Sequence, residues 1–139
     1  MKQIIALMFA LVFALVITAC TNLVQTDTDM SNVEGSLSYA ELISLPDNAR
    51  ITVALADVSK MDAAAEVISS QSFIADGKQV PFYFQLDYKL DEVKQNHTYA
   101  VSARIEVNGK LMFITDTANH VITDPAATNK LNLILVKVK

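Results

Sequence analysis

The sequence has 139 residues, is 52% hydrophobic, and carries 11 basic and 15 acidic side chains for a formal net charge of −4. This length suits a single domain. Binding of nucleic-acid phosphates requires a clustered basic face, and no run of Lys or Arg offers one, so nucleic acid is excluded as a partner. Much of the hydrophobic excess lies in residues 4–17, and the remainder has the composition of a soluble domain.

Residues 1–19 have the parts of a bacterial secretory signal: Lys2, an apolar stretch and then small residues. The stretch is short for a transmembrane helix, which needs about 20 apolar residues. The tetrapeptide ITAC at residues 17–20 resembles the lipobox of bacterial lipoproteins. We therefore predict cleavage between Ala19 and Cys20 and attachment of a diacylglyceryl group to the Cys20 thiol. The alternative is an ordinary signal peptide in which Cys20 is incidental.

Lipidation of Cys20 would anchor the mature chain in a membrane. A single acyl chain gives only marginal binding, so the thiol-linked lipid and a further chain on the freed amine together make the anchor firm. Cys20 is the one cysteine, so the domain has no disulfide. Thr21 follows it, whereas Asp is the typical inner-membrane retention signal at that position. The expected location is the outer membrane, facing the periplasm, with no cofactor besides the lipid.

The chain after the signal divides into a polar tether at residues 20–32 and a domain at residues 33–139. Within the domain, hydrophobic residues alternate with a period of two, which is typical of strands with one buried face. Pro81 indicates an edge or the start of a strand, because it cannot donate to a ladder. Residues 59–65 favour a loop. The predicted strands are residues 33–40, 50–58, 67–75, 80–88, 98–107, 110–114 and 131–138.

Asn108-Gly109 predicts a two-residue hairpin, since both turn positions need positive φ. A regular register from this turn places Met112 and Ile114 in the core and Leu111 and Phe113 on the outer face. In the last strand the apolar residues first occupy odd and then even positions, which predicts a bulge or a strand covered on both sides.

About seven short, mostly antiparallel strands with scarcely any helical pattern predict an all-β protein, specifically a β-sandwich. The cysteine and tryptophan landmarks of immunoglobulin domains are absent from the sequence. We therefore predict a β-sandwich but not the immunoglobulin topology.

The mature sequence offers little for catalysis. Its two histidines, His97 and His120, lie in no recognisable motif. We expect each of them to be an ordinary histidine in a loop or at an edge. The aspartates are too scattered for a calcium loop, and the three glycines cannot form a phosphate-binding loop. We expect no catalytic residue, no metal site and no enzymatic activity.

Two features favour an interaction surface. Leu111 and Phe113, flanked by Tyr83 and Arg104, are predicted to form an outward apolar patch, although such residues also pack beneath loops. An edge strand could instead accept an extended peptide. The sequence does not indicate which edge is open.

The mature domain contains the segments VEGSLSY at 33–39, LPDNA at 45–49, ITV at 51–53, LADVS at 55–59, YAVSARI at 99–105, GK at 109–110 and TDT at 115–117. Together they cover nearly the whole mature domain, and they resemble the YbaY/YscW-like lipoproteins. The resemblance implies a lipid-anchored, non-enzymatic binding domain with a β-sandwich fold. Its best-understood members are pilotins of type III secretion, which bind the C-terminal segment of a secretin and guide it to the outer membrane.

The expected function is that of an outer-membrane lipoprotein whose periplasmic domain binds an unknown envelope protein or other envelope component. One alternative is a true pilotin-type chaperone whose partner is a secretin. A second alternative is a small protein that acts on envelope carbohydrates or lipids.

Overall fold

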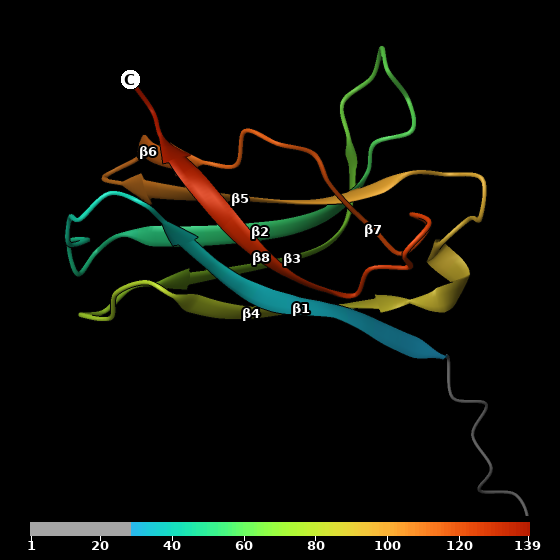
Figure 1. Cartoon of the computed structure of the whole chain (residues 1–139), viewed down its shortest axis with the longest axis horizontal. Helices are drawn as coiled ribbons and strands as arrows, with labels where there is room; N and C mark the ends of the chain where they lie inside the picture. The colour runs from blue at the N-terminus through green and yellow to red at the C-terminus, as the bar shows by residue number, and fades with distance from the viewer. Residues whose placement is uncertain (1–28) are drawn as a thin grey trace, which may run out of the picture.

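The structure is a computed structural model that describes residues 29–139. The predicted signal peptide, Cys20 and most of the predicted tether lie outside the described residues. Eight strands and one short 3₁₀ helix make up the described part, which confirms the predicted all-β class (Figure 1). Within residues 29–139, no helix is long and apolar enough to cross a bilayer.

The strands follow the predicted segments closely. Their bounds are β1 Met30–Tyr39, β2 Arg50–Asp57, β3 Glu66–Ile74, β4 Phe82–Lys89, β5 Tyr99–Val107, β6 Lys110–Ile114, β7 Asn119–Val121 and β8 Lys130–Lys137, with the 3₁₀ helix η2 at Leu90–Glu92. The short strand β7 was not predicted, and it places His120 on a strand that pairs only with β5.

The first strand begins earlier than the sequence indicates. Residues 30–32 were assigned to the tether, but they pair with residues 87–89 of β4. A polar segment can join a strand when its ladder partner is in place, since the pairing satisfies its backbone groups. The tether predicted for residues 20–32 is therefore wrong for its last three residues.

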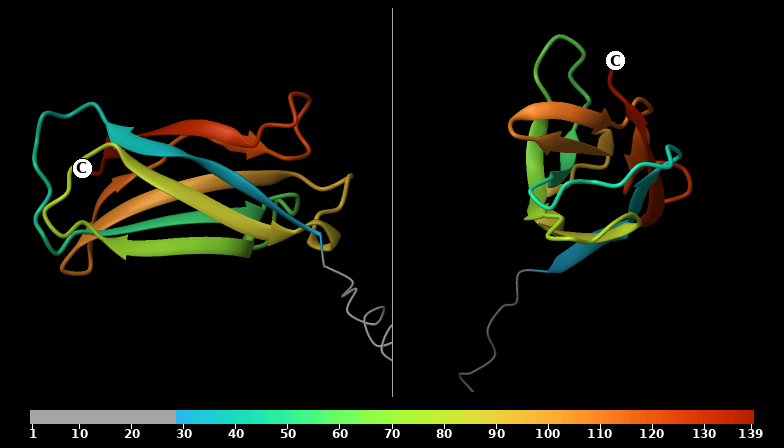
Figure 2. Two further views of the ribbon diagram at one scale, coloured as in Figure 1. Left: turned by 90° about the horizontal axis from the view of Figure 1, so that it is seen from below. Right: turned by 90° about the vertical axis from the view of Figure 1, so that its left-hand side faces the viewer.

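All eight strands belong to one sheet, in the order β3-β2-β5-β6-β8-β1-β4, with β7 paired to β5. Neighbours are antiparallel except β1 and β8, which run parallel. The right-hand view of Figure 2, along the long axis, shows the strands arranged around a ring. The sheet is thus a nearly closed barrel, which differs from the two separate sheets of the predicted sandwich. The difference arises because β8 pairs with both β6 and β1 and so makes the sheet continuous.

The core fills the inside of this barrel. The predicted alternation is confirmed in β4 and β5, where every second side chain is buried. A ring stack links β1 to β6 across β8, since the ring centroids of Tyr39 and Phe113 lie 4.1 Å apart. The largest fully buried side chains are Tyr99, Phe113, Leu37, Ile51, Leu55, Leu86, Ile105, Leu133, Leu135, Val33, Val53 and Val101.

A bulge in β6 overturns the predicted hairpin register. The Asn108-Gly109 turn is confirmed, with φ of 51° and 78°, and Glu106 pairs with Leu111 as expected. Ile105 then pairs with Phe113, which leaves Met112 as an extra residue in β6. The shift turns Phe113 into the core and Ile114 to the surface, the reverse of the prediction.

The parallel pair of β1 and β8 packs closely at Gly35. A Cβ atom there would lie 1.8 Å from the carbonyl oxygen of Leu131, so only glycine fits. The β8 strand has neither the bulge nor the two-sided cover that the sequence predicts. Leu133 and Leu135 are buried while Ile134 and Val136 are exposed, which is a plain alternation.

Candidate functional site

The barrel has a seam where β3 and β4, the two ends of the strand path, lie side by side. Within residues 29–139, no backbone hydrogen bond joins these two strands. The link is a side chain: the backbone N–H of Gln85 on β4 donates to Oε1 of Gln71 on β3 at 3.1 Å. The two strand edges therefore face each other without forming a ladder.

The hydrogen bonds at the seam show which backbone groups are free. The Gln85 N–H points toward β3, so by the two-residue period the N–H of Tyr83 points the same way. The N–H of Ala75 donates to the carbonyl of Ala49, which places it toward β2. The backbone groups of the alternate residues, at 70, 72 and 74, therefore point away from β2 and into the seam.

Aromatic side chains lie beneath the seam. Phe73 of β3 and Phe82 of β4 pack with their ring centroids 5.7 Å apart and their planes tilted by 57°. Both rings belong to the inward face of their strands, and Phe82 is buried while Phe73 is partly buried. The seam thus has an apolar floor between its two polar backbone edges.

Two hollows flank the link between Gln71 and Gln85, and Gln71 and Tyr83 line both. One hollow, of about 630 Å³, extends over β4, β1 and β8 to Lys130. The other, of about 690 Å³, extends to Ile74 and Pro81. Tyr83 stands between them with 76% of its surface exposed. Together the seam and its hollows form a groove with an exposed aromatic ring at its rim.

The charges around the groove are unevenly placed. Residues 67–74 of β3 include no charged side chain, although Glu66 begins the strand and Lys78, just beyond its end, lines the second hollow. On the other side, the Glu34 carboxylate lies 3.5 Å from Lys130 Nζ, and Asp87 accepts a hydrogen bond from the side chain of Gln85 at 2.8 Å. The β3 edge is therefore neutral between Glu66 and Lys78, while Glu34 and Asp87 on the other side have polar partners.

The predicted apolar patch does not exist as one surface. Tyr83 lies at the groove, but Arg104 lies on β5, where its Nε pairs with Glu106 at 2.7 Å. Phe113 is fully buried against Tyr39, and Leu111 is partly buried. The bulge in β6 is the physical reason, because it reverses the faces of the residues that follow it.

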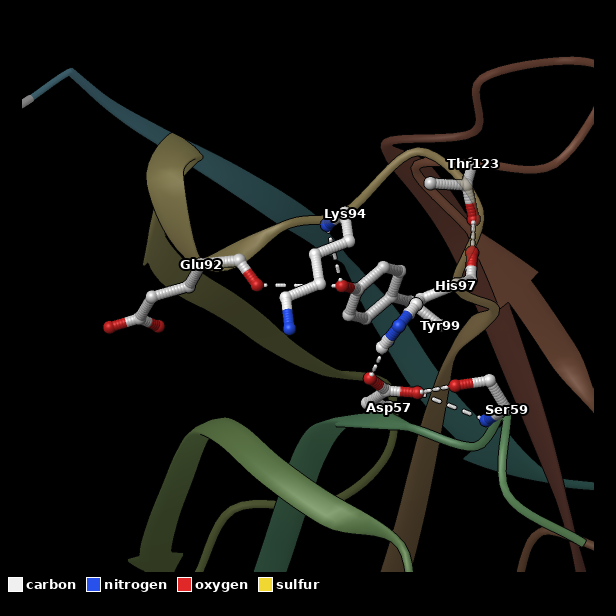
Figure 3. Close-up of polar contacts among 7 residues, drawn as sticks. All are labelled: Asp57, Ser59, Glu92, Lys94, His97, Tyr99 and Thr123. Carbon is white, nitrogen blue, oxygen red and sulfur yellow. Dashed lines mark hydrogen bonds and ion pairs between the residues drawn. The ribbon is translucent and has the colours of Figure 1, made fainter.

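A polar cluster lies at the end of the barrel where the chain enters (Figure 3). His97 Nδ1 lies 2.5 Å from Asp57 Oδ2, and the other carboxylate oxygen accepts hydrogen bonds from the backbone and hydroxyl of Ser59. The bonds from Ser59, and next the bond from His97, lower the pKa of Asp57 to about 2. Asp57 is thus a firmly ionised acceptor.

The same cluster fixes the loop between β4 and β5. The hydroxyl of Tyr99 accepts from the backbone N–H of Lys94 at 2.8 Å and contacts the carbonyl of Glu92 at 3.4 Å. Thr123 donates its hydroxyl to the carbonyl of His97 at 2.7 Å, which ties in the loop before β8. These bonds hold three separate segments together.

The geometry of this cluster differs from that of a hydrolase triad. In a triad the histidine lies between the nucleophile and the carboxylate, but here Ser59 and His97 both bind the carboxylate. His97 and His120 line one hollow of about 310 Å³ together with Asp124. The described residues nevertheless contain no group of three His, Cys, Asp or Glu side chains placed to hold a metal. The arrangement serves to join loops.

Sequence reasoning missed Gln71, Ser72, Phe73 and Phe82 as residues of the groove. Two signals pointed there: the uncharged run at 67–75 and the early Pro81, which marked β4 as an edge. The position of β3 at the opposite end of the sheet order carried no local signal, because it depends on the parallel pairing of β1 with β8.

Known proteins share this domain. A family model described as "Type III secretion system lipoprotein chaperone (YscW)" matches residues 28–133, which is most of the chain. The chain belongs to the YscW family. This confirms the resemblance to YbaY/YscW-like lipoproteins. A chaperone role is one of binding, which agrees with the expectation of a non-enzymatic protein.

Two individual proteins are similar to this YscW-family chain. The uncharacterized lipoprotein YbaY of Escherichia coli (strain K12) is 38% identical over 106 residues, which are 76% of this chain and 56% of that protein. This chain thus spans little more than half the length of that curated relative. The structure of an alternative pilotin from the type II secretion system of Vibrio cholerae matches with a TM-score of 0.77 and 52% identity, covering 80% of this chain and 99% of that one.

Proposed function

We propose that this chain is a lipid-anchored periplasmic chaperone that binds a segment of an envelope protein in the groove between β3 and β4. The groove supports this proposal because it combines an aromatic floor, an exposed Tyr83 and free backbone groups along one line. A surface of this kind recognises a peptide segment by both its side chains and its backbone.

The form of chaperone that fits best is a pilotin, with a secretin as its client. The similarity to a Vibrio cholerae pilotin, at 52% identity over 99% of that structure, supports this choice. In this proposal, diacylglycerol on Cys20 holds the mature chain at the inner leaflet of the outer membrane. The groove binds the C-terminal segment of the secretin, and the lipid determines where the client is delivered.

The test measures binding of the full-length lipoprotein in detergent micelles to overlapping synthetic peptides that cover the C-terminal region of the host's secretin. Tyr83→Ala is expected to weaken binding by about tenfold, since buried aromatic anchors contribute most of the energy of such interfaces. Val136→Ala removes an exposed apolar side chain from β8 and serves as the matched control. Binding that is equally strong in both variants would place the client elsewhere on the barrel, and absence of binding to any peptide would exclude the secretin as client.

A further inference from the structure

The solvent face of the sheet over β4, β1 and β8 carries six side chains in two rows. The buried residues of each strand fall on one set of alternate positions, so the other set points to solvent. The strand register places three such residues side by side in each row, and all six line the hollow of about 630 Å³. We call them the polar array: Tyr83, Ser36 and Asn132 form one row and Gln85, Glu34 and Lys130 the other.

The first row of the array encloses a space of the size of a small ring. Neighbouring strands lie about 4.8 Å apart, so Tyr83 and Asn132 are about 10 Å apart with Ser36 between them. The short side chain of Ser36 keeps the middle of the row low, whereas the exposed Tyr83 presents its ring at one end. A tyrosine ring has an apolar face and a polar hydroxyl, so it can pack on the C–H face of a sugar ring.

The amide side chains of the array keep hydrogen-bonding atoms free. Ser36 Oγ donates to Oδ1 of Asn132 at 2.8 Å, which leaves Nδ2 of Asn132 as a donor without an acceptor among residues 29–139. Nε2 of Gln85 donates to Oδ1 of Asp87 at 2.8 Å, which leaves Oε1 of Gln85 as an acceptor. A free donor on β8 and a free acceptor on β4 therefore lie on opposite sides of β1.

The charges and the backbone of the array limit what it can bind. Its two charged members neutralise each other, since Oε1 of Glu34 lies 3.5 Å from Nζ of Lys130. A ligand with a net charge therefore gains little there. Both edges of β1 are already paired, with β4 and with β8, so an extended peptide finds no backbone group to pair with. A neutral ligand rich in hydroxyl and amide groups uses the free donor and the free acceptor together.

We propose that the polar array binds an uncharged chain of N-acetylated amino sugars, which is the chemistry of a cell-wall glycan strand. The ring of Tyr83 packs on one sugar ring, while Asn132 donates to an acetamido carbonyl and Gln85 accepts from an acetamido N–H or a hydroxyl. This site goes beyond the proposed function, with which it shares only the side chain of Tyr83.

The first measurement is a titration of the full-length lipoprotein with the N-acetylglucosamine tetramer, in micelles of a detergent that has no sugar headgroup. Asn132→Ala is expected to weaken binding by about tenfold, because the sugar loses its amide donor. Ile134→Ala removes the next outward side chain of β8, which lies outside the hollow, and is expected to bind as the wild type does. Thermal unfolding verifies that both variants are folded. No binding by the wild type, or equal binding by Asn132→Ala, would overturn the proposal.

The second measurement tests the ring of Tyr83. Tyr83→Phe keeps the ring face and is expected to bind the tetramer within about twofold of the wild type, whereas Tyr83→Ala is expected to lose about tenfold. A Phe variant as weak as the Ala variant would show that the hydroxyl, and not ring packing, holds the sugar, and would overturn the proposed arrangement.

Two further ligands separate the possible outcomes. Maltotetraose has hydroxyl groups but no acetamido groups, so binding as tight as that of the tetramer would overturn the assignment to amino sugars. The secretin peptides test the proposed function in the same samples. If the wild type binds a peptide but not the tetramer, this inference fails while the proposed function stands. If it binds the tetramer but no peptide, the proposed function fails and the sugar site stands.

Discussion

Single residues at the chain-entry end of the barrel determine how its loops are held. The carboxylate of Asp57 lies at the end of β2 and receives Ser59 from its own loop and His97 from the loop before β5. The backbone of His97 is held in turn by Thr123. The sequence offered His97 as an isolated histidine, because the partners that give it a role are distant in the chain.

The hydrogen bonds to the Asp57 carboxylate make a pH-dependent contribution to the free energy of unfolding. Folding lowers the pKa of Asp57 from 3.8 to about 2, chiefly through Ser59 and then His97. The contribution is therefore present above the unfolded pKa and is lost as the pH falls from 3.8 to about 2. Asp57→Asn is expected to lower the free energy of unfolding by about 1 kcal/mol at neutral pH.

Urea unfolding of the wild type and Asp57→Asn at several pH values checks this prediction. The difference between the two proteins is expected to shrink below about pH 4. Asp116→Asn, which removes an exposed loop carboxylate, controls for the loss of charge. A difference that is constant from neutral pH to about pH 2 would contradict the assignment.

For the secondary-structure elements, the alternation of hydrophobic residues predicted where the strands lie. It did not predict which strands and side chains contact each other. β4 and β5 alternate regularly, so their inward faces were predicted correctly from sequence. In β6 the residues LMFI are all apolar, so their pattern does not distinguish the two faces. The stack of Phe113 on Tyr39 belongs to the bulged register, and Tyr39 is far away in the chain.

The bulge predicts unequal costs for truncating two residues of β6. Phe113→Ala removes a fully buried ring and is expected to lower the free energy of unfolding by about 4 kcal/mol. Leu111→Ala, two residues earlier and partly exposed, is expected to cost about 1 kcal/mol. Chemical denaturation of both variants measures these differences. A loss for Phe113→Ala as small as that for Leu111→Ala would instead favour the regular register, which places both residues on the outer face.

For the whole molecule, the sequence predicted the all-β class but not the closure of the sheet. Period-two patterns show which side chains face inward, yet they do not identify a parallel neighbour that lies at the other end of the chain. The groove was foreseen only as an unidentified open edge. Its position follows from the sheet order, which places β3 and β4 at the two ends of one path.

The lipid anchor is the prediction that concerns the whole molecule in the cell. Cys20→Ser in the full-length chain is expected to abolish incorporation of radiolabelled palmitate, because the modified thiol is removed. The protein should then leave the outer-membrane fraction, since no acyl chains remain to hold it there. Fractionation followed by immunoblotting measures this shift. A Cys20→Ser protein that stays in the outer membrane would show that another feature anchors it.

The parallel pairing of β1 with β8 also governs when this molecule can fold. Ser36 and Asn132, whose side chains are hydrogen-bonded across this pair, are 96 residues apart in the chain. Until β8 has been made, β1 and β4 have no hydrogen-bonded neighbour in the rest of the sheet. Such distant contacts form slowly, so the barrel of a growing chain cannot close until β8 has been made. A protein built this way suits export through a narrow translocation channel, with folding completed on the far side of the membrane.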